Sequence, residues 1–225
     1  MINEFFKYLH VSPSMLSLCA TQTLYMVFVS LFIGSFFALI LSFLLVLTRE
    51  GGIKENKVMF FVLNSVINVV RSVPFIILLV FILPVTKAIV GTRIGTTAAL
   101  VPLTTFITPY LSRLFENSLL GVNKGIIEAA KAMGASTFEI IVHFILPEAK
   151  SSLILSVTIG TITLLGATAM AGVIGGGGVG DLALTYGYER MNFPLMLFTV
   201  IVLVVFVQII QSVGNFLAAK ARGHK

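Results

Sequence analysis

Residues 128–149 read EAAKAMGASTFEIIVHFILPEA, a polar, helix-forming stretch inside an otherwise apolar chain. The stretch contains three glutamates, Lys131 and His143, whereas charged residues make up only 11% of the 225 residues and hydrophobic residues 57%. A soluble domain normally carries about twice that share of charge. The composition is therefore that of a membrane protein, and this stretch is a part of it that must lie in water.

The stretch is predicted to form two short helices that meet at a glycine. Glu128–Met133 is strong helix-forming sequence, and Gly134 suits the left-handed turn that ends a helix. Ser136 and Glu139 fit a capping box, whose N-cap contributes about 1 kcal/mol. Leu146-Pro147 is predicted to break the second helix before the next apolar segment. The apolar face predicted for that helix consists of Phe138, Ile141, Val142 and Ile145. A solvated linker would not need these features in succession, so a compact, rigid knob is the favoured interpretation.

Five other segments are long and apolar enough to span a bilayer, which takes about 20 residues. They are residues 23–47, 58–85, 94–112, 151–173 and 193–217. Backbone groups cannot stay unpaired in lipid, and the apolar residues do not alternate as in a barrel, so these segments should be helices. The predicted fold class is an all-α integral membrane protein with one domain over residues 1–225 and a loop over 113–150.

The distribution of basic residues predicts the orientation of the chain. Four of them (Lys7, Lys87, Arg93 and Arg190) fall on one side of the predicted spans, and Arg71 lies within a span. The other side holds Arg49, Lys54, Lys57, Arg113, Lys124, Lys131, Lys150, Lys220, Arg222 and Lys225. Because the richer side is normally cytoplasmic, we expect the 113–150 loop and the C-terminus inside and the N-terminus outside.

The net charge of +6 is thus attributed to membrane topology and the bilayer, and no nucleic-acid partner is expected. Residues Met1–His10 could form a short interfacial helix. Cys19 is the single cysteine, which excludes an internal disulfide and a cysteine-rich metal site.

Residues of the knob resemble the EAA motif of ABC importer permeases. The matching positions are Glu128-Ala129-Ala130, Gly134 after three residues, Phe144 after nine more, and Leu146-Pro147. Many members of the family have isoleucine where Phe144 stands. The resemblance implies that the loop is the coupling helix that enters a cleft on a separate ATPase subunit, with Glu128 fixing the loop by ion pairing or hydrogen bonding. The residues implied in this coupling are Glu128, Ala129, Ala130, Gly134, Ala135, Ser136, Glu139, Leu146 and Pro147.

Three further stretches look like the permeases of bacterial methionine importers. They are Arg71–Leu79, Val101–Thr104 and Gly176–Gly180 continuing through Tyr186-Gly187-Tyr188. The resemblance implies a homodimer of two five-helix subunits in the inner membrane, two ATPase subunits on the cytoplasmic side and an extracytoplasmic methionine-binding protein. It also implies that ATP and Mg²⁺ bind to the ATPase, that this chain holds no cofactor, and that the substrate is L- or D-methionine.

Three residues within the spans are candidates for the pore or its gate. Arg71 is a charge in a span, which costs about 2.5–3.5 kcal/mol by insertion scales unless it faces protein or water. It either lines the pore with Pro74 or pairs with helix-end carbonyls that Pro74 frees. Met170 lies among small residues and either closes the pore against a second copy or simply packs between helices. Asn64 and Asn68 are predicted to form hydrogen bonds between helices.

Gly175–Gly178 resembles a phosphate loop only superficially, because the chain has no GxxxxGK[ST] sequence. The stretch is predicted to form a tight turn at the outer mouth. Gly177, Gly178, Tyr186 and Tyr188 either contact the binding protein or belong to a plain loop.

Three other functions compete with methionine transport. A permease for another small amino acid or a dipeptide would have the same knob. A membrane enzyme would need convergent polar groups, and the sequence has no nucleophile–base constellation and no paired carboxylates in its spans. A purely structural subunit would not require the spacing of the knob. His143 has no second ligand at a useful spacing, so no metal site is expected.

Overall fold

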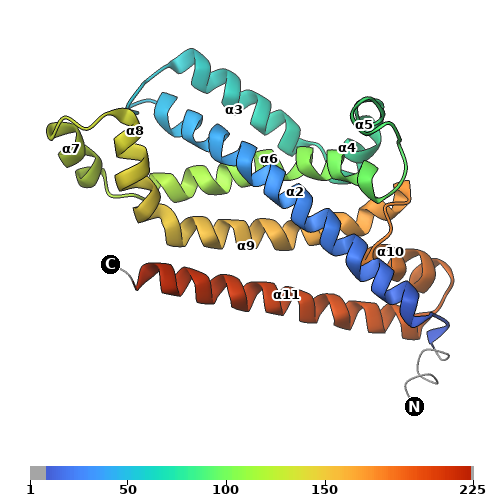
Figure 1. Ribbon diagram of the computed structural model, residues 1–225. Coiled ribbons are helices and arrows are strands. Elements are labelled where there is room, and N and C mark those ends of the chain that lie inside the picture. Colours follow the sequence, from blue (N-terminus) through green and yellow to red (C-terminus); the bar gives the residue numbers. More distant parts are fainter. Residues whose placement is uncertain (1–8, 224–225) are drawn as a thin grey trace. The chain divides into compact units, whose positions relative to one another are not determined.

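The computed structural model describes residues 9–223, and every regular element among them is helical (Figure 1). The elements are α2 (Pro13–Thr48), α3 (Lys57–Ser72), α4 (Phe75–Phe81), α5 (Leu83–Val90), α6 (Thr96–Leu120), α7 (Lys124–Ala132), α8 (Thr137–Glu139), the π-helix η1 (Ile140–Ile145), α9 (Leu146–Met170), the 3₁₀ helix η2 (Ala171–Ile174), α10 (Val179–Asp181), the π-helix η3 (Leu182–Glu189) and α11 (Phe193–Arg222). The predicted all-α class is confirmed. The interfacial helix predicted over Met1–His10 lies mostly outside the described residues.

The chain packs as two compact units, each assembled from three separate segments. Unit 1 contains the residues up to Ile33, Val73–Ile107 and Thr161–Ile210. Unit 2 contains Gly34–Ser72, Thr108–Gly160 and the residues from Gln211 onward. The knob therefore belongs to unit 2, and the glycine-rich stretch belongs to unit 1.

Within residues 9–223, three helical segments are long and apolar enough to cross a membrane by themselves. They are Pro13–Thr48, Thr137–Ile174 and Phe193–Arg222, and a fourth arises if α3 and α4 count as one bent span. The segment Thr137–Ile174 has 38 residues, or about 57 Å of helix, against a hydrocarbon core of about 30 Å. Its first turns therefore extend into water.

The segment predicted as the second span, residues 58–85, is not one straight helix. It breaks between Ser72 and Phe75 and again at Ile82, giving α3, α4 and α5. Pro74 has no N–H to donate and disfavours helical geometry at the preceding residue. It is the N-cap of α4, and its carbonyl accepts the N–H groups of Ile77 and Leu78, each at 3.0 Å.

The segment predicted as the third span continues as helix beyond residue 112. Arg113 and Glu116 were expected in the cytoplasmic loop, and both lie inside the 25-residue helix α6. Their charges are compatible with a buried helix because they pair with each other, Arg113 Nη1 to Glu116 Oε2 at 2.7 Å. Arg113 therefore no longer counts among the basic residues of the loops. Without it, the side of the membrane predicted to be cytoplasmic still holds more basic residues than the other side.

A core of apolar side chains closes unit 1 around the start of α2. Leu9, Val11, Cys19, Val179, Leu182 and Leu195 are buried together. Two side chains of α2 also reach the glycine-rich stretch, because the N–H of Gly178 donates to Gln22 Oε1 at 3.0 Å and that of Val179 donates to Thr23 Oγ1 at 2.8 Å. The first long helix therefore holds the loop that follows α9.

Candidate coupling site

Helix α7 ends in a glycine turn that matches the prediction. Gly134 has a φ of 80°, in the left-handed region that favours glycine. Its N–H donates to the Lys131 carbonyl at 2.9 Å, and the N–H of Ala135 donates to the Ala130 carbonyl at 3.1 Å. These two bonds form a Schellman motif, which satisfies carbonyls that the helix end would otherwise leave unpaired. The reversal of the chain after Met133 is therefore a defined structure rather than a loose loop.

The predicted capping box at the start of α8 is confirmed. The Glu139 N–H donates to Ser136 Oγ at 3.3 Å, and the Ser136 N–H donates to Glu139 Oε2 at 2.7 Å. These hydrogen bonds to Ser136 hold the pKa of the Glu139 carboxyl below its ordinary value, with a smaller contribution from His143. The carboxylate is fully exposed, so its role is local: it fixes the angle at which α8 begins.

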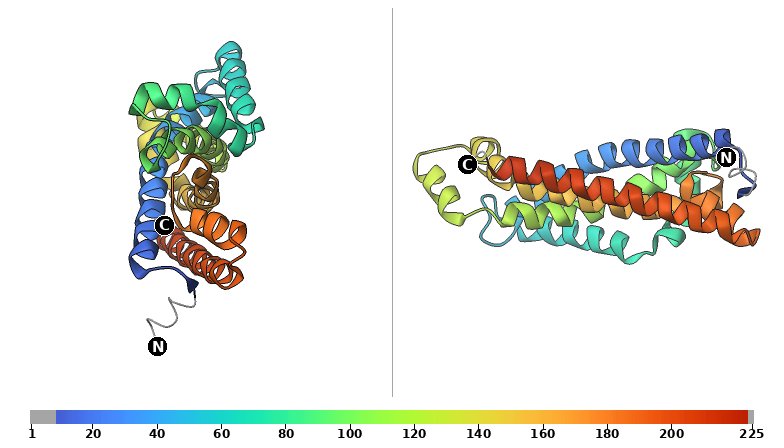
Figure 2. Two further views of the ribbon diagram at one scale, coloured as in Figure 1. Left: turned by 90° about the vertical axis from the view of Figure 1, so that its right-hand side faces the viewer. Right: turned by 90° about the horizontal axis from the view of Figure 1, so that it is seen from below.

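A cluster of buried side chains attaches the two short helices to the rest of unit 2. Its members are Leu119, Val122, Ala130, Ile140, Ile145 and Ala149, with partly buried neighbours that include Phe43, Val46 and Ile53. Ala130 has no exposed surface, so the second alanine of the EAA triplet is a packing position. In Figures 1 and 2, α7 and α8 project beyond the neighbouring ends of α6 and α9. We call α7, the Gly134 turn and α8 the knob.

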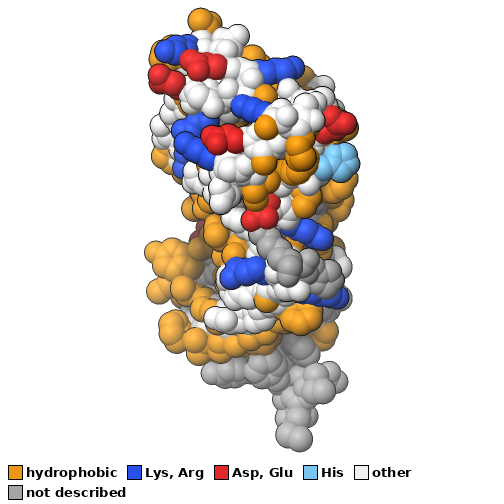
Figure 3. Space-filling model, turned by 90° about the vertical axis from the view of Figure 1, so that its left-hand side faces the viewer, with side chains coloured by type: hydrophobic (Ala, Val, Ile, Leu, Met, Phe, Trp, Pro, Cys, Tyr) orange, Lys and Arg blue, Asp and Glu red, His pale blue; other side chains and the backbone are white. Residues whose placement is uncertain are grey.

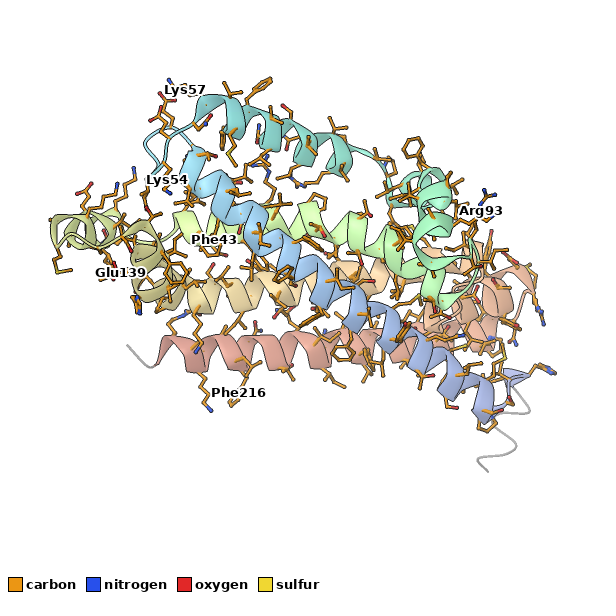
Figure 4. The ribbon with its side chains drawn as sticks, turned by 45° about the horizontal axis from the view of Figure 1, so that its top comes forward. Phe43, Lys54, Lys57, Arg93, Glu139 and Phe216 are labelled. Carbon is orange, nitrogen blue, oxygen red and sulfur yellow. The ribbon has the colours of Figure 1, made fainter. Side chains whose placement is uncertain are left out.

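The exposed side of the knob carries two large apolar side chains. Met133 and Phe138 are each 71% exposed, one at the end of α7 and one in α8. Glu128 and Ala129 are exposed on the same short helix, and Glu139 stands out from α8 in Figure 4. Methionine is a flexible side chain that adapts to the surface of a protein partner. The sequence predicted Phe138 as part of the buried face and did not single out Met133.

Two details of the knob differ from the sequence predictions. The Glu128 side chain makes no hydrogen bond or ion pair with any residue of the described part of the chain, so the structure shows no such contact that would fix the loop. Leu146-Pro147 does not break the helix, because the backbone runs from α8 through the π-helix η1 into α9. Pro147 lies two residues after the end of the π-helix. The different hydrogen-bond spacing of the π-helix accommodates the missing N–H of the proline without a break in the helix.

A partly buried polar network joins α3 to α6. Arg113 Nη2 donates to Asn68 Oδ1 at 2.9 Å and also to Asn64 Oδ1, which confirms the predicted bonds between helices. Only 17% of the Arg113 side chain and 8% of the Glu116 side chain are exposed. The guanidinium therefore has three acceptors, and the charge pair is shielded from solvent.

Hydroxyl groups make the next connections within unit 2, from α6 to α9 and from α9 to α11. Ser152 Oγ donates to Ser118 Oγ at 2.9 Å, and the hydroxyls of Ser118 and Ser156 are 2.9 Å apart. Ser151 Oγ donates to the Ala218 carbonyl of α11 at 2.9 Å. Together with the Arg113 network, these bonds join four helices into one frame, α3, α6, α9 and α11.

The three pore candidates lie on different elements. Arg71 is exposed in the last turn of α3 and makes no hydrogen bond or ion pair with residues 9–223, so the expected pairing with freed carbonyls is not present. Its charge faces the helix C-terminus, where the helix dipole stabilises it. Pro74 caps α4, and Met170 is exposed at the end of α9. Arg71 belongs to unit 2, whereas Pro74 and Met170 belong to unit 1.

The glycine-rich stretch is less open than the sequence suggested. Gly178 is buried, and a side chain on Gly177 would collide with Gln22, whose Oε1 would be 2.2 Å from the added carbon. Tyr186 lies beneath the Arg190 guanidinium, 4.3 Å from the ring centre. Tyr188 is 64% exposed, so it is the one of the four predicted contact residues that a partner can reach most easily.

The described residues contain no group of three or more His, Cys, Asp or Glu side chains placed to hold a metal ion. The features that the structure shows at this end of unit 2 are the knob, the exposed Met133 and Phe138, and the polar network between the helices behind them.

Comparison with known proteins agrees with this geometry. Residues 45–223 match the model of the family described as "Binding-protein-dependent transport system inner membrane component". The chain is 44% identical over 218 residues to a probable D-methionine transport system permease protein, MetI, of Vibrio cholerae, covering 97% of each protein. It is 42% identical over 174 residues to the methionine import system permease protein MetP of Bacillus subtilis, covering 77% of this chain and 78% of that one.

A solved structure shows the same fold. A chain of the MetNI methionine ABC transporter in an inward-facing conformation superposes with a TM-score of 0.91 and 41% identity, covering 93% of this chain and 97% of that one. The chain is therefore a member of the binding-protein-dependent transport system inner membrane component family.

Proposed function

We propose that this chain is the permease subunit of an ATP-driven methionine importer. The observation that carries the proposal is the knob: a rigid double turn that exposes Met133 and Phe138 while its backbone is tied into unit 2. Relatives that cover nearly the whole chain are named as methionine permeases, which supports methionine as the substrate. The ATPase is a separate protein in this proposal, and this chain binds it without binding nucleotide.

The mechanism is alternating access driven through the knob. Two copies of the chain, each with five spans, form the pore, with the N-terminus outside and the C-terminus in the cytoplasm. ATP binding closes the ATPase pair, the two knobs move together, and the pore opens outward to accept methionine from its binding protein. Hydrolysis reverses the movement. The Schellman turn and the capping box serve this step because a flexible loop would absorb the displacement.

The other candidate residues take part in the proposed assembly at its outer side and in its pore. Tyr188 and Tyr186 contact the binding protein at the outer side, and Gly177 and Gly178 shape the turn that presents them. Met170 of each copy narrows the pore, which its exposure at the end of α9 allows. Arg71 and Pro74 act at the break between α3 and α4.

Uptake of radiolabelled methionine into proteoliposomes tests the proposed function. The vesicles contain this chain and its ATPase, with the binding protein outside and ATP inside. We expect ATP-dependent uptake that unlabelled methionine abolishes. If an unrelated amino acid or a dipeptide suppressed the uptake and unlabelled methionine did not, the chain would be assigned to another small solute.

A second experiment tests the contact itself. The double variant Met133→Ser/Phe138→Ser removes the exposed apolar side chains and leaves the buried cluster intact. We expect the variant to lose co-purification with the ATPase and to lose transport. A matched control, Val58→Ser/Phe61→Ser, removes two exposed apolar side chains of α3. Equal retention of the ATPase by the knob variant and the control would refute the coupling role.

A further inference from the structure

A groove lies in unit 2 where α9 begins and α11 ends. Its volume is about 570 Å³, and its walls come from α7, η1, α9 and the last turns of α11. Phe144, Pro147, Ile154 and Leu217 supply apolar surface. The groove shares Ile126 with the knob, but it does not include the exposed Met133 and Phe138, which carry the proposed contact with the ATPase.

Basic side chains dominate the charge of this groove. Lys150 and Lys220 line it, both exposed, and one acidic residue, Glu148, lies with them. A smaller recess shares Pro147 and Glu148 with the groove and adds Arg222. Lys and Arg side chains are plentiful over this end of unit 2 (Figure 3). Two positive charges in the groove and a third in the adjoining recess, against one negative charge, make this region attractive to an anion.

The groove continues into an exposed apolar strip on α11. Val213, Phe216 and Leu217 are exposed by 52%, 68% and 47%, and they lie within two turns of Lys220 on the same helix. Phe216 projects from α11 away from the neighbouring helices in Figure 4. If the charged head group of a lipid lay at the lysines, its acyl chains could therefore lie along this apolar strip.

We propose that this groove is a binding site for an anionic phospholipid. The phosphate lies between Lys150, Lys220 and Arg222, and the acyl chains follow Val213 and Phe216. A free phosphate would use only the basic side chains and leave the apolar strip without a function. A zwitterionic lipid would bring its own cation against three positive charges. An anionic phospholipid uses both surfaces at once, and the site requires only that the chain lies in a membrane.

Native mass spectrometry of the full chain with its ATPase, purified in detergent, tests the site. The probes are phosphatidylglycerol, phosphatidylcholine with the same acyl chains, and inorganic phosphate. We expect phosphatidylglycerol to be retained and to raise the temperature of thermal unfolding, and neither of the other probes to do so. In the variant Lys150→Gln/Lys220→Gln we expect the affinity for phosphatidylglycerol to fall at least about tenfold, since each basic residue near an anionic head group contributes roughly fivefold.

The matched control is Lys54→Gln/Lys57→Gln, which removes one positive charge from the turn between α2 and α3 and one from the first residue of α3. Both pairs are exposed, so both variants should fold, and elution as a single species in size-exclusion chromatography checks this. Equal loss of phosphatidylglycerol in the two variants would show a general charge effect and overturn the site. Equal retention of phosphatidylcholine, stabilisation by inorganic phosphate alone, or cross-linking of groove residues to a second copy would overturn the lipid as its occupant.

Discussion

Replacing Arg113 by methionine should destabilise unit 2 more than any surface substitution. The change removes the guanidinium and leaves the Glu116 carboxylate, 8% exposed, without its charge partner. It also leaves the amide oxygens of Asn64 and Asn68 without a donor. Breaking a buried ion pair by removing one partner costs about 3–5 kcal/mol, because the remaining charge stays buried.

The same geometry predicts that a second substitution restores stability. In the variant Arg113→Met/Glu116→Leu no charge is left buried, and replacing both partners of such a pair by apolar residues is often neutral or stabilising. We therefore expect the double variant to recover at least about 2 kcal/mol relative to Arg113→Met. At about 2–4 °C per kcal/mol, the single variant should unfold roughly 6–20 °C below the parent.

Thermal unfolding in detergent, followed by circular dichroism, measures both variants. The control is Lys57→Met, since Lys57 lies 3.7 Å from Glu50 with side chains 73% and 84% exposed. An exposed pair of this kind contributes about 0–1 kcal/mol. Two outcomes would show that a desolvated ion pair does not hold α3 to α6. One is that Arg113→Met lowers the unfolding temperature no more than Lys57→Met does. The other is that Glu116→Leu lowers the unfolding temperature of Arg113→Met further.

Three further perturbations test the knob and the frame. Gly134→Val forces a β-branched residue to a φ of 80° and should abolish ATP-dependent uptake while the chain still inserts, as membrane fractionation would show; full uptake would contradict the rigid turn. Ser136→Ala removes the cap and should weaken the start of α8 by about 1 kcal/mol, seen as faster amide hydrogen exchange at Glu139. In the parent, the ionised Glu139 carboxylate stabilises the start of α8, and its pKa is lowered in the folded chain. The protection against exchange should therefore be complete above the ordinary carboxyl pKa and be lost as the pH falls through the lower pKa of the folded chain. Protection that stays constant down to acid pH would refute the capping role. Gly214→Leu should separate α9 from α11, because even a Cβ there would lie 2.1 Å from Thr158 Oγ1. A cross-linking yield between the two helices equal to that of the parent, which has glycine at this position, would show that the close approach is not required.

The sequence predicted those features whose signals are local. Gly134 ends α7, and Ser136 with Glu139 starts α8, because each motif is specified within six residues. The apolar composition likewise predicted an all-helical membrane chain. These features depend on backbone chemistry and on hydropathy, both of which can be read without knowing which helices are neighbours.

The features that the sequence missed depend on contacts between distant residues. Arg113 lies in a helix rather than in the loop because Asn64 and Asn68, more than 40 positions earlier, accept its hydrogen bonds. Across the π-helix before Pro147, Ile140 and Ile145 are both buried although they are five positions apart, and Phe138, predicted on the face of Ile145, is exposed. A period of 3.6 residues cannot anticipate such a change of register.

The contact between α2 and the glycine-rich stretch has a consequence for biosynthesis. Gln22 and Thr23 accept the N–H groups of Gly178 and Val179, and in each pair the two residues are 156 positions apart. At a translation rate of about 5–20 residues per second, roughly 8–30 s pass between the synthesis of the acceptors and that of the donors. During that interval the two acceptors must stay available beside the translocon. These two hydrogen bonds therefore form late in synthesis, after residue 179 has been made.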